Sequence, residues 1–381
     1  MKIDDKTSHN SPSLRFPEFT GEWKEERLSE IADIYKGAGI SKDQLSDNGE
    51  PCILYGELYT KYKTETITEV ISRTDIDNTK LVRSKANDVI IPCSGETAED
   101  IATARCVIKD GILLGGDLNI IRLHNYDGSF VSYQLNGKRK YDIAKVAQGV
   151  SVVHLYGEHL KGVKTVNPYL AEQKKISRFL SLLDERIAVQ NRLIEDLKKL
   201  RCAIVEKMFK QSKANGRLGD FIEQVSVRNK NGLYSNVLSV SNKQGFVKQS
   251  EQFEDRTVAS DDTSNYKIVK RNNFAYNPAR INVGSIARLT KFDVGIVSPM
   301  YVCFRTKASI IPEYMEAFFT SQQFFYEMMK RLEGSVRLCL SYEGLCNIPV
   351  YIPDMNKQIA MGQNISLILS KIGLEIEYLG T

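Results

Sequence analysis

The sequence predicts an α+β protein in which two similar globular domains are separated by a pair of long antiparallel coiled-coil helices. Two observations lead to this prediction: a weak internal repeat, and a long stretch of helical periodicity between its two copies. The length of 381 residues agrees with it, because domains contain roughly 150 residues. Hydrophobic residues at 42% and charged residues at 26% are ordinary for a folded protein, so disorder as the main state is excluded.

The repeat relates the two halves of the chain at one main offset of 185 positions. The matched pairs are Gly149 with Gly334, Leu155 with Leu340, Glu158 with Glu343, Leu160 with Leu345, Pro168 with Pro353, Leu182 with Leu367, and Ile187 with Ile372. Near the start of each half, Arg27-Leu28 matches Arg217-Leu218. The repeat predicts five segments. They are an N-terminal segment 1–23, a first domain 24–167, a central coiled-coil helix 168–215, a second domain 216–353 and a distal coiled-coil helix 354–381.

The segment after Pro168 carries the clearest helical signal. Its apolar residues follow heptad-like spacing at Ile176, Phe179, Leu180, Leu183, Ile187, Leu193, Ile194, Leu197, Leu200, Ile204 and Met208. No Gly or Pro interrupts it before Gly216, and about 40 helical residues would form a rod of roughly 60 Å. A helix with one apolar stripe needs a partner, which the distal helix supplies in part. The eleven apolar positions exceed what this shorter helix can cover. We expect Ile176, Leu183, Leu197 and Ile204 to contact partner proteins.

Each domain shows mixed α and β signals. Short β-like runs, such as 89–91, 118–123, 237–240 and 300–304, are separated by turns rich in Gly, Asn and Asp. A helical stretch at 312–331 intervenes in the second domain. These patterns predict α+β domains of about 140 residues each.

The search for catalytic motifs is negative. The sequence contains neither a phosphate-binding G-x-x-x-x-G-K-[ST] loop nor a dinucleotide-binding G-x-G-x-x-G after a strand. The four histidines and seven cysteines do not have the spacing of a metal site, and no C-x-x-C pair occurs. We therefore expect a chain without catalysis, metal or cofactor of its own. With no apolar segment long enough for a membrane span and no apolar leader, we expect it to be cytoplasmic.

The charge distribution indicates where a polyanion could bind. Lys plus Arg exceeds Asp plus Glu by only 52 to 47, so the net charge alone does not indicate a polyanion partner. Local clusters of basic residues have to be considered instead. The run 267–291 holds six basic residues and no acidic one, with aromatic and Asn residues interspersed. Cations suit phosphates, while Asn and Arg can hydrogen-bond base edges. The candidate DNA-binding residues in this run are Lys270, Arg271, Asn277, Arg280, Asn282 and Arg288. The alternative is a solvated surface on which Asn277 and Asn282 satisfy their own turns.

In the first domain acidic residues are mixed with the basic ones. Fewer residues there stand out as candidates for binding DNA. Lys36 and Lys42 flank a Gly-Ala-Gly turn. We choose these two residues, together with Ser94 and Arg105, as the DNA-binding candidates of this domain.

Three motifs resemble the specificity (S) subunit of type I restriction-modification systems. Leu14-Arg15-Phe16-Pro17, followed by Gly21-Glu22-Trp23, is similar to the opening of that family. The run from Pro168 to Ile176 is similar to its central helical region, and the run from Tyr276 to Ile286 resembles a motif of its target-recognition domains. Together with the two-half layout, the resemblance covers essentially the whole chain.

The resemblance implies a DNA-reading scaffold. Each globular domain would be a target-recognition domain for one half of a bipartite double-stranded DNA site. The helices would dock two methyltransferase subunits, and motor-nuclease subunits would complete the complex. S-adenosylmethionine, ATP and Mg would then be held by the partner subunits. The distal helix departs from the expected pattern, because the repeat carries Phe209 to position 394 and the sequence stops at 381. A truncated variant is therefore one expectation.

Two other classes of function remain open from the residues alone. The chain could be an enzyme, a methyltransferase or nuclease with an unrecognised active site. It could also be a coiled-coil scaffold that never meets DNA, with the basic run as a solvated face.

Overall fold

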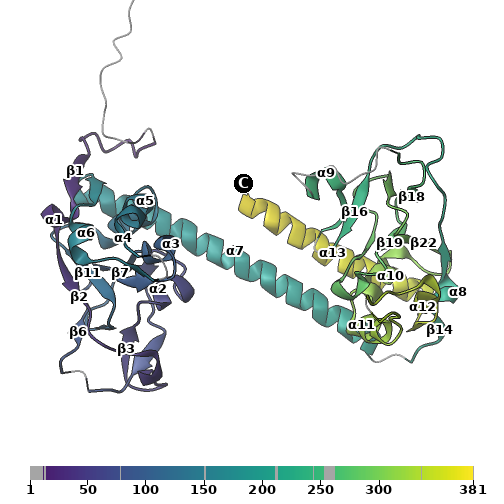
Figure 1. Cartoon of the computed structure of the whole chain (residues 1–381), viewed down its shortest axis with the longest axis horizontal. Helices are drawn as coiled ribbons and strands as arrows, with labels where there is room; N and C mark the ends of the chain where they lie inside the picture. The colour runs from purple at the N-terminus through teal and green to yellow at the C-terminus, as the bar shows by residue number, and fades with distance from the viewer. Residues whose placement is uncertain are drawn as a thin grey trace, which may run out of the picture. The chain divides into compact units, whose positions relative to one another are not determined.

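The structure is a computed structural model (Figure 1). It describes residue 12 and residues 14–380, apart from 78, 150–151, 211–212, 243, 253–261 and 336. The chain forms two compact units, residues 1–188 and 189–381, and each is described by itself. Both contain sheets and helices, so the predicted α+β class is confirmed. The division between the units falls inside the central helix, not at its ends.

The first unit is built on two sheets. The larger has the order β2-β11-β7-β9-β4, antiparallel except for the parallel pair β9 and β4. Its strands are β2 (Ala32–Lys36), β11 (Leu118–Leu123), β7 (Asp88–Pro92), β9 (Arg105–Val107) and β4 (Thr66–Ile67). The smaller sheet has the order β5-β3-β10-β6, with β5 (Ser72–Thr74), β3 (Glu50–Ile53), β10 (Leu113–Leu114) and β6 (Val82–Arg83). Strand β7 is buried along its whole length, as its β-branched run predicts.

Short helices cover the larger sheet of this unit. They are α1 (Leu28–Ile31), α2 (Glu57–Thr60), α3 (Ala98–Ile101), α4 (Gly128–Asn136), α5 (Lys140–Val146) and α6 (Gly157–Lys161). Asp127 caps α4 by accepting a hydrogen bond from the Phe130 backbone N–H, which satisfies one free donor of the first turn. Phe130, Val131 and Leu135 then bury their side chains in one core with the sheet residues Val89 and Ile121. A second core lies on the other face, around Ile90 and Leu118.

Apart from a short strand pair at its junction with the last helix, the described part of the second unit contains a four-stranded antiparallel sheet and two separate strand pairs. The sheet has the order β15-β22-β19-β20, with β15 (Ile222–Gln224), β22 (Val302–Thr306), β19 (Phe274–Tyr276) and β20 (Ile286–Arg288). The pairs are β16 (Leu238–Ser241) with β17 (Gly245–Lys248), and β18 (Lys267–Lys270) with β21 (Val294–Val297). Its short helices are α8 (Leu218–Phe221), α9 (Gln249–Gln252), α10 (Pro312–Phe319), α11 (Gln322–Met329) and α12 (Tyr342–Cys346). Aromatic rings dominate the core, with Phe274 stacked on Phe304 at 5.2 Å between centroids.

Two long helices, α7 (Leu170–Lys210) and α13 (Met355–Gly380), are the predicted coiled-coil helices. Within the second unit they run antiparallel. Gln190 of α7 hydrogen-bonds Glu375 near the end of α13, while Val205 and Phe209 share a core with Ile365 nearer its start. The antiparallel pairing is therefore confirmed for this part of α7. No described helix combines the length and apolar character that crossing a membrane requires.

The internal repeat is also a structural repeat. Strand β1 (Lys24–Arg27) pairs with β13 (Lys164–Asn167) where the first domain meets α7, and β14 (Gly216–Arg217) pairs with β23 (Pro349–Val350) before α13. The matched glycines Gly149 and Gly334 have φ of 125° and 114°. A Cβ on Gly149 would lie 2.0 Å from the Val152 carbonyl oxygen, and a Cβ on Gly334 would lie 2.4 Å from the Arg337 carbonyl oxygen. Both turns therefore require glycine.

Candidate nucleic-acid interface

In the folded second unit, acidic side chains from outside the basic run 267–291 contact one of its arginines. Arg288, on β20, donates to Glu316 of α10 at 3.0 Å and also pairs with Glu313. Its side chain is only 9% exposed. Burial raises the pKa of the Glu316 carboxyl, although the neighbouring Arg288 opposes this shift. Arg288 therefore ties the sheet to α10, and we leave it out of the DNA-contacting residues proposed below.

Lys270 and Arg271 lie together at the end of β18. Arg271 donates from Nε to Asp293 at 2.8 Å and also to the Thr290 carbonyl at 2.5 Å, so its guanidinium is partly used within the unit. Lys270 is exposed. Both remain candidates for phosphate contacts, because exposed cations tolerate a change of partner at little cost.

Asn277 and Arg280 line one small polar hollow of about 110 Å³. The other residues around it are Ser239, Val240, Ser241, Asn242, Val283, Ser285 and Tyr301. The Asn277 side chain accepts a hydrogen bond from the Ala279 backbone N–H at 3.1 Å, which is the turn-stabilising role considered above as the alternative. Arg280 is exposed at the start of the 3₁₀ turn η2 (Ile281–Val283). Asn282 lies half-buried in that turn and is not among the lining residues.

The four candidates of the first unit do not form one site. Lys36 is exposed at the end of β2, with its Nζ 4.0 Å from Asp117. Ser94 lies in β8 (Ser94–Gly95), directly opposite His154 of β12 (Val153–His154). Lys42 is exposed in the 3₁₀ turn η1 (Lys42–Gln44).

Arg105 is buried inside the first unit. Its guanidinium donates to the carbonyls of Leu58 and Tyr62, each at 3.1 Å, and burial lowers its pKa. This guanidinium links α2 to β9, so it stabilises the fold of the first unit. We therefore leave Arg105, like Arg288, out of the proposed DNA-contacting residues.

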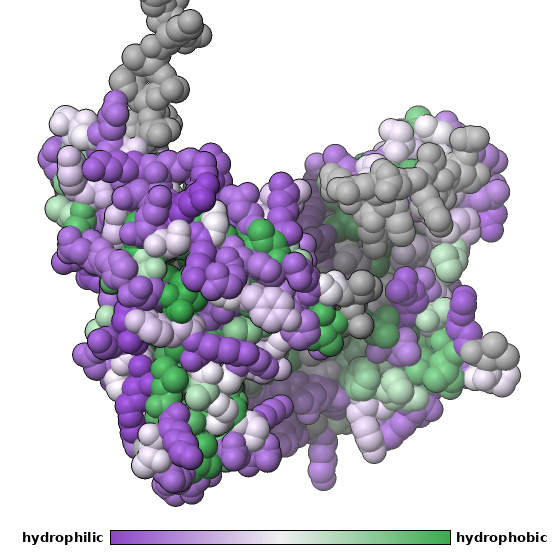
Figure 2. All heavy atoms as spheres, turned by 60° about the vertical axis from the view of Figure 1, so that its left-hand side comes forward, coloured by the Kyte–Doolittle hydropathy of each residue, from purple (hydrophilic) through white to green (hydrophobic). Residues whose placement is uncertain are grey.

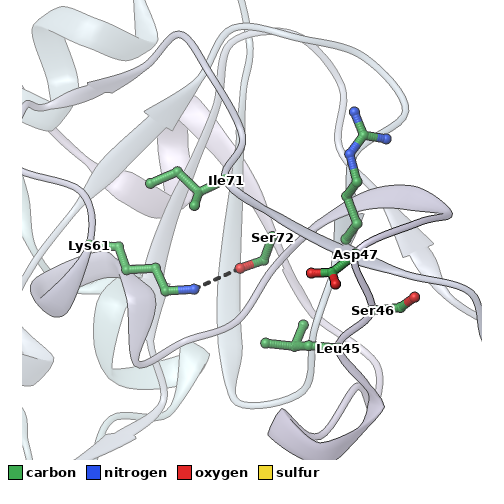
Figure 3. Close-up of a pocket in the computed structure, with 7 residues that line it drawn as sticks. Leu45, Ser46, Asp47, Lys61, Ile71 and Ser72 are labelled. Carbon is green, nitrogen blue, oxygen red and sulfur yellow. Dashed lines mark hydrogen bonds between the residues drawn. The ribbon is translucent and has the colours of Figure 1, made fainter.

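An open hollow of about 550 Å³ lies directly after η1 in the first unit (Figure 3). It is lined by Leu45, Ser46, Asp47, Lys61, Ile71, Ser72 and Arg73. Lys61 donates to Ser72 at 2.8 Å, and both side chains point into the hollow (Figure 3). The sequence interpretation missed Lys61 and Arg73. No local signal marks them, because contacts between distant parts of the chain bring them to the hollow. Arg73 of β5 pairs with Ser46, and Lys61 hydrogen-bonds Ser72 of the same strand.

The apolar stripe of α7 divides into buried ends and an exposed middle. Ile176 packs against the core of the first unit, and Ile204 packs against the core of the second. Leu197 is half-buried, whereas Leu183 is 43% exposed. Other exposed apolar residues of the helix are Phe179, Leu182, Ile187, Val189, Leu193 and Leu200. The middle of the helix therefore presents an apolar surface that could be covered by another protein.

Metal sites and buried thiols can be assessed in the described part of the chain. No group of three or more His, Cys, Asp or Glu residues there could hold a metal ion. Burial raises the pKa of Cys52 and Cys93 to about 11, and that of Cys106 and Cys303 to about 12. These thiols stay protonated at neutral pH and are poor nucleophiles.

These features define a class of two-domain α+β proteins with two long helices and a repeated junction between domain and helix. Residues 20–199 match the family described as "Type I restriction modification DNA specificity domain". The chain is 25% identical over 197 residues to the type I restriction enzyme MjaVIII specificity subunit of Methanocaldococcus jannaschii. That match spans 51% of this chain and 43% of the relative, so it covers less than half of that protein.

A solved structure extends the likeness in fold to nearly the whole chain. The S subunit of a type I restriction-modification system from M. genitalium covers 97% of this chain and 95% of its own, with a TM-score of 0.62 at 18% identity. Residues 20–199 are therefore similar to the type I restriction-modification DNA specificity family, and nearly the whole chain is similar in fold to an S subunit.

Proposed function

We propose that this chain is a specificity subunit of a type I restriction-modification system and reads a bipartite double-stranded DNA site, one half with each unit. The observation that carries the proposal is the structural repeat. The same junction between domain and helix occurs twice, while the polar surfaces of the two domains differ. A repeated frame with different polar surfaces suits the recognition of two unlike half-sites.

The second unit would contact its half-site through Asn277, Arg280 and Asn282, with Lys270 and Arg271 nearby on phosphates. Arg280 is the strongest of these candidates, because it is exposed beside a polar hollow. Arginine can donate two hydrogen bonds to guanine, so a base contact from this position is chemically reasonable. Lys36, Lys42 and Ser94 would contribute in the first unit. The face of that unit turned forward in Figure 2 is mostly hydrophilic, which agrees with a surface that meets a polar ligand.

The exposed middle of α7 would dock two methyltransferase subunits. Leu183 lies there, while Ile176 and Ile204 would support the docking surface from the cores beneath it. Leu197, which is half-buried, would complete the surface. Motor-nuclease subunits would join the complex for restriction. S-adenosylmethionine, ATP and Mg would be bound by those partners, and the assembly would act on cytoplasmic DNA.

A methylation map tests the proposal. The chain is expressed with the methyltransferase subunits of its system in a host that lacks other methylases, and modified adenines are located by sequencing. We expect one bipartite, asymmetric motif that disappears when this chain is omitted. Methylation that persists without the chain, or that lacks a sequence motif, would contradict the proposal. The absence of salt-dependent DNA binding by the complex would favour a scaffold role, because phosphate contacts make affinity fall with salt.

A further inference from the structure

The internal repeat includes an exposed tyrosine–lysine pair on one short helix of each unit, α5 and α11 (Figure 1). Tyr141 and Lys145 of α5 match Tyr326 of α11 and Lys330 directly after it, both at the offset of 185 positions. The Lys145 ammonium lies 4.3 Å from the centre of the Tyr141 ring, and the Lys330 ammonium lies 3.7 Å from the centre of the Tyr326 ring. The two tyrosines are 68% and 62% exposed. The two pairs therefore have the same arrangement on the surface of their units.

These exposed pairs are not what anchors the two helices. The matched residues Ile143 and Met328, which are 0% and 1% exposed, pack into the cores of their units instead. Two exposed apolar neighbours of the second unit, Phe325 and Met329, have Lys140 and Ala144 at the matched positions of the first. What repeats on the surface is thus polar and cationic, and it recurs without a role in the core. Such a feature is expected to contact something that both units meet.

Each pair also has the same balance of charge around it. Asp142 and Glu327 follow the two tyrosines, and each forms an ion pair with an arginine, Asp142 with Arg139 at 3.3 Å and Glu327 with Arg331 at 2.7 Å. Counted with the lysine of the pair, each group contains two cations and one carboxylate, a net charge of +1. Lys330 donates to Glu327 at 2.9 Å, but an ammonium has three N–H donors, so this bond leaves others for a ligand. Lysine and tyrosine side chains are both among the groups that contact DNA phosphates.

In the second unit, α11 lies beside the turn that carries the proposed DNA-contacting residues. The helix packs against η2, which directly follows Arg280. Beyond the glycine turn after α11, the Leu340 backbone N–H donates to the Pro278 carbonyl at 3.1 Å. Pro278 is the neighbour of Asn277 in the sequence. The tyrosine–lysine pair of this unit and its proposed base-contacting turn therefore belong to one connected part of the unit.

The first unit repeats this connection. The Leu155 backbone N–H, at the position matching Leu340, donates to the Cys93 carbonyl at 2.8 Å. Cys93 matches Pro278 at the same offset, and Ser94, a DNA-contacting candidate, follows it. Helix α5 packs on α3, which in turn packs on the strand β8 that contains Ser94. In both units the tyrosine–lysine helix is therefore linked to the segment proposed to face DNA.

We propose that each tyrosine–lysine pair binds a phosphate of the DNA backbone at the half-site of its unit. The lysine ammonium and the tyrosine hydroxyl donate to the phosphate oxygens, and the ring holds the lysine in place. Two unlike half-sites differ in their bases but share the same backbone, so a contact that repeats between the units suits the backbone. A second protein suits the pairs less well, because lysine is depleted in protein–protein interfaces. The inference rests on the proposed DNA-reading function and adds residues outside the set chosen from the sequence.

The test measures DNA affinity against salt for the full chain assembled with its methyltransferase subunits. Lys145→Gln and Lys330→Gln are made singly and together. Each should make the slope of log affinity against log salt shallower by about 0.9, and the double variant by about twice that, because each lysine contacts one phosphate. Binding should weaken evenly across a pool of randomised duplexes, so the methylated motif should not change.

The tyrosine hydroxyls are tested by Tyr141→Phe with Tyr326→Phe, which keeps each lysine over an aromatic ring. Losing two neutral hydrogen bonds should weaken binding by roughly 2- to 12-fold for each hydroxyl, with the salt slope unchanged.

Two controls separate a phosphate contact from a general change of charge. Lys145→Arg with Lys330→Arg keeps both charges and should preserve the salt slope. Lys109→Gln with Lys230→Gln removes one exposed lysine of each unit outside the two helices and should match wild type.

Unchanged affinity and salt slope in a folded Lys145→Gln/Lys330→Gln complex would overturn the proposal. Relaxed preference at one base position would also overturn it, because it would mark base readout. So would a complex that lacks methyltransferase subunits, since the pairs would then dock a protein. In these three cases the proposed function stands as long as the wild-type complex reads its motif. If the wild-type complex shows no sequence preference, the proposed function itself fails.

Discussion

Gln173 and Gln358, which lie 185 positions apart, make the same hydrogen bonds in the two units. Gln173 donates to the Pro168 carbonyl at 2.8 Å and accepts the Asp127 backbone N–H at 2.9 Å. Gln358 donates to the Pro353 carbonyl at 3.0 Å and accepts the Ile311 backbone N–H at 3.0 Å. Both are 1% exposed. Each glutamine therefore joins the first turn of a long helix to its own domain.

These glutamines should be needed for stability. Gln358→Leu leaves the Ile311 N–H buried without its acceptor, which should lower the free energy of unfolding by about 1–3 kcal/mol. Gln363→Leu, on an exposed position of the same helix, is the matched control and should change it little. Urea denaturation of the purified chain measures both. Equal stabilities for the two variants would show that the buried amide contributes nothing.

Two glycines inside α13 should respond to alanine with opposite signs. A Cβ on Gly362 would lie 2.9 Å from the Glu313 Cβ, whereas a Cβ on Gly373 meets no atom within 4 Å in the described structure. Gly373→Ala should stabilise the chain by roughly 0.5–1 kcal/mol, because alanine favours a helix interior. Gly362→Ala should destabilise it by separating α10 from α13. Thermal melting distinguishes the two, and a stabilising Gly362→Ala would contradict the close packing described here.

Arg280 should affect DNA recognition in the second half-site. If it reads a base, Arg280→Ala should cost about 1–3 kcal/mol of binding free energy and relax one position of the motif. If it contacts only phosphate, binding should weaken evenly across sequences. Arg305→Ala removes an exposed arginine paired with Glu223 on the sheet edge and provides the control. Affinity and motif both unchanged in a folded Arg280→Ala complex would rule out either role.

Assembly should depend on the exposed middle of α7. Leu183→Asp with Leu197→Asp should prevent methyltransferase subunits from docking, because burying unpaired carboxylates is expensive. Glu185→Ala with Lys199→Ala changes exposed polar residues of the same helix and should leave assembly intact. Light-scattering masses of the co-purified complexes report the outcome. A full-sized complex from the double Asp variant would place docking elsewhere.

The sequence predicted the large features of the fold because they repeat or are periodic. The matched Pro168 and Pro353 precede long helices, and the matched Gly149 and Gly334 adopt the same unusual backbone angle. Gly362 would be expected only to weaken a helix from its residue type, but it has a packing role instead. Its contact with α10 depends on a residue nearly 50 positions away.

The details of the site could not be predicted, because they depend on residues distant in the chain. Arg288 seemed to lie in an acid-free run, but Glu313 and Glu316 reach it from α10, 25 and 28 residues later. Arg105 is held by carbonyls 47 and 43 residues earlier. Charge counted along a sequence does not measure charge in space. Asn277 and Arg280 could be placed side by side from the sequence because they lie in one short turn, and both line the same hollow.

Independent reading of two half-sites is the central claim, and a segment exchange tests it most directly. Residues 217–350 are replaced by the matching segment of a relative with a different motif, and the methylated motif of the chimeric complex is sequenced. The account predicts that one half of the motif changes to that of the donor while the other half and the methylation activity persist. A folded, active chimera in which both halves change would contradict it.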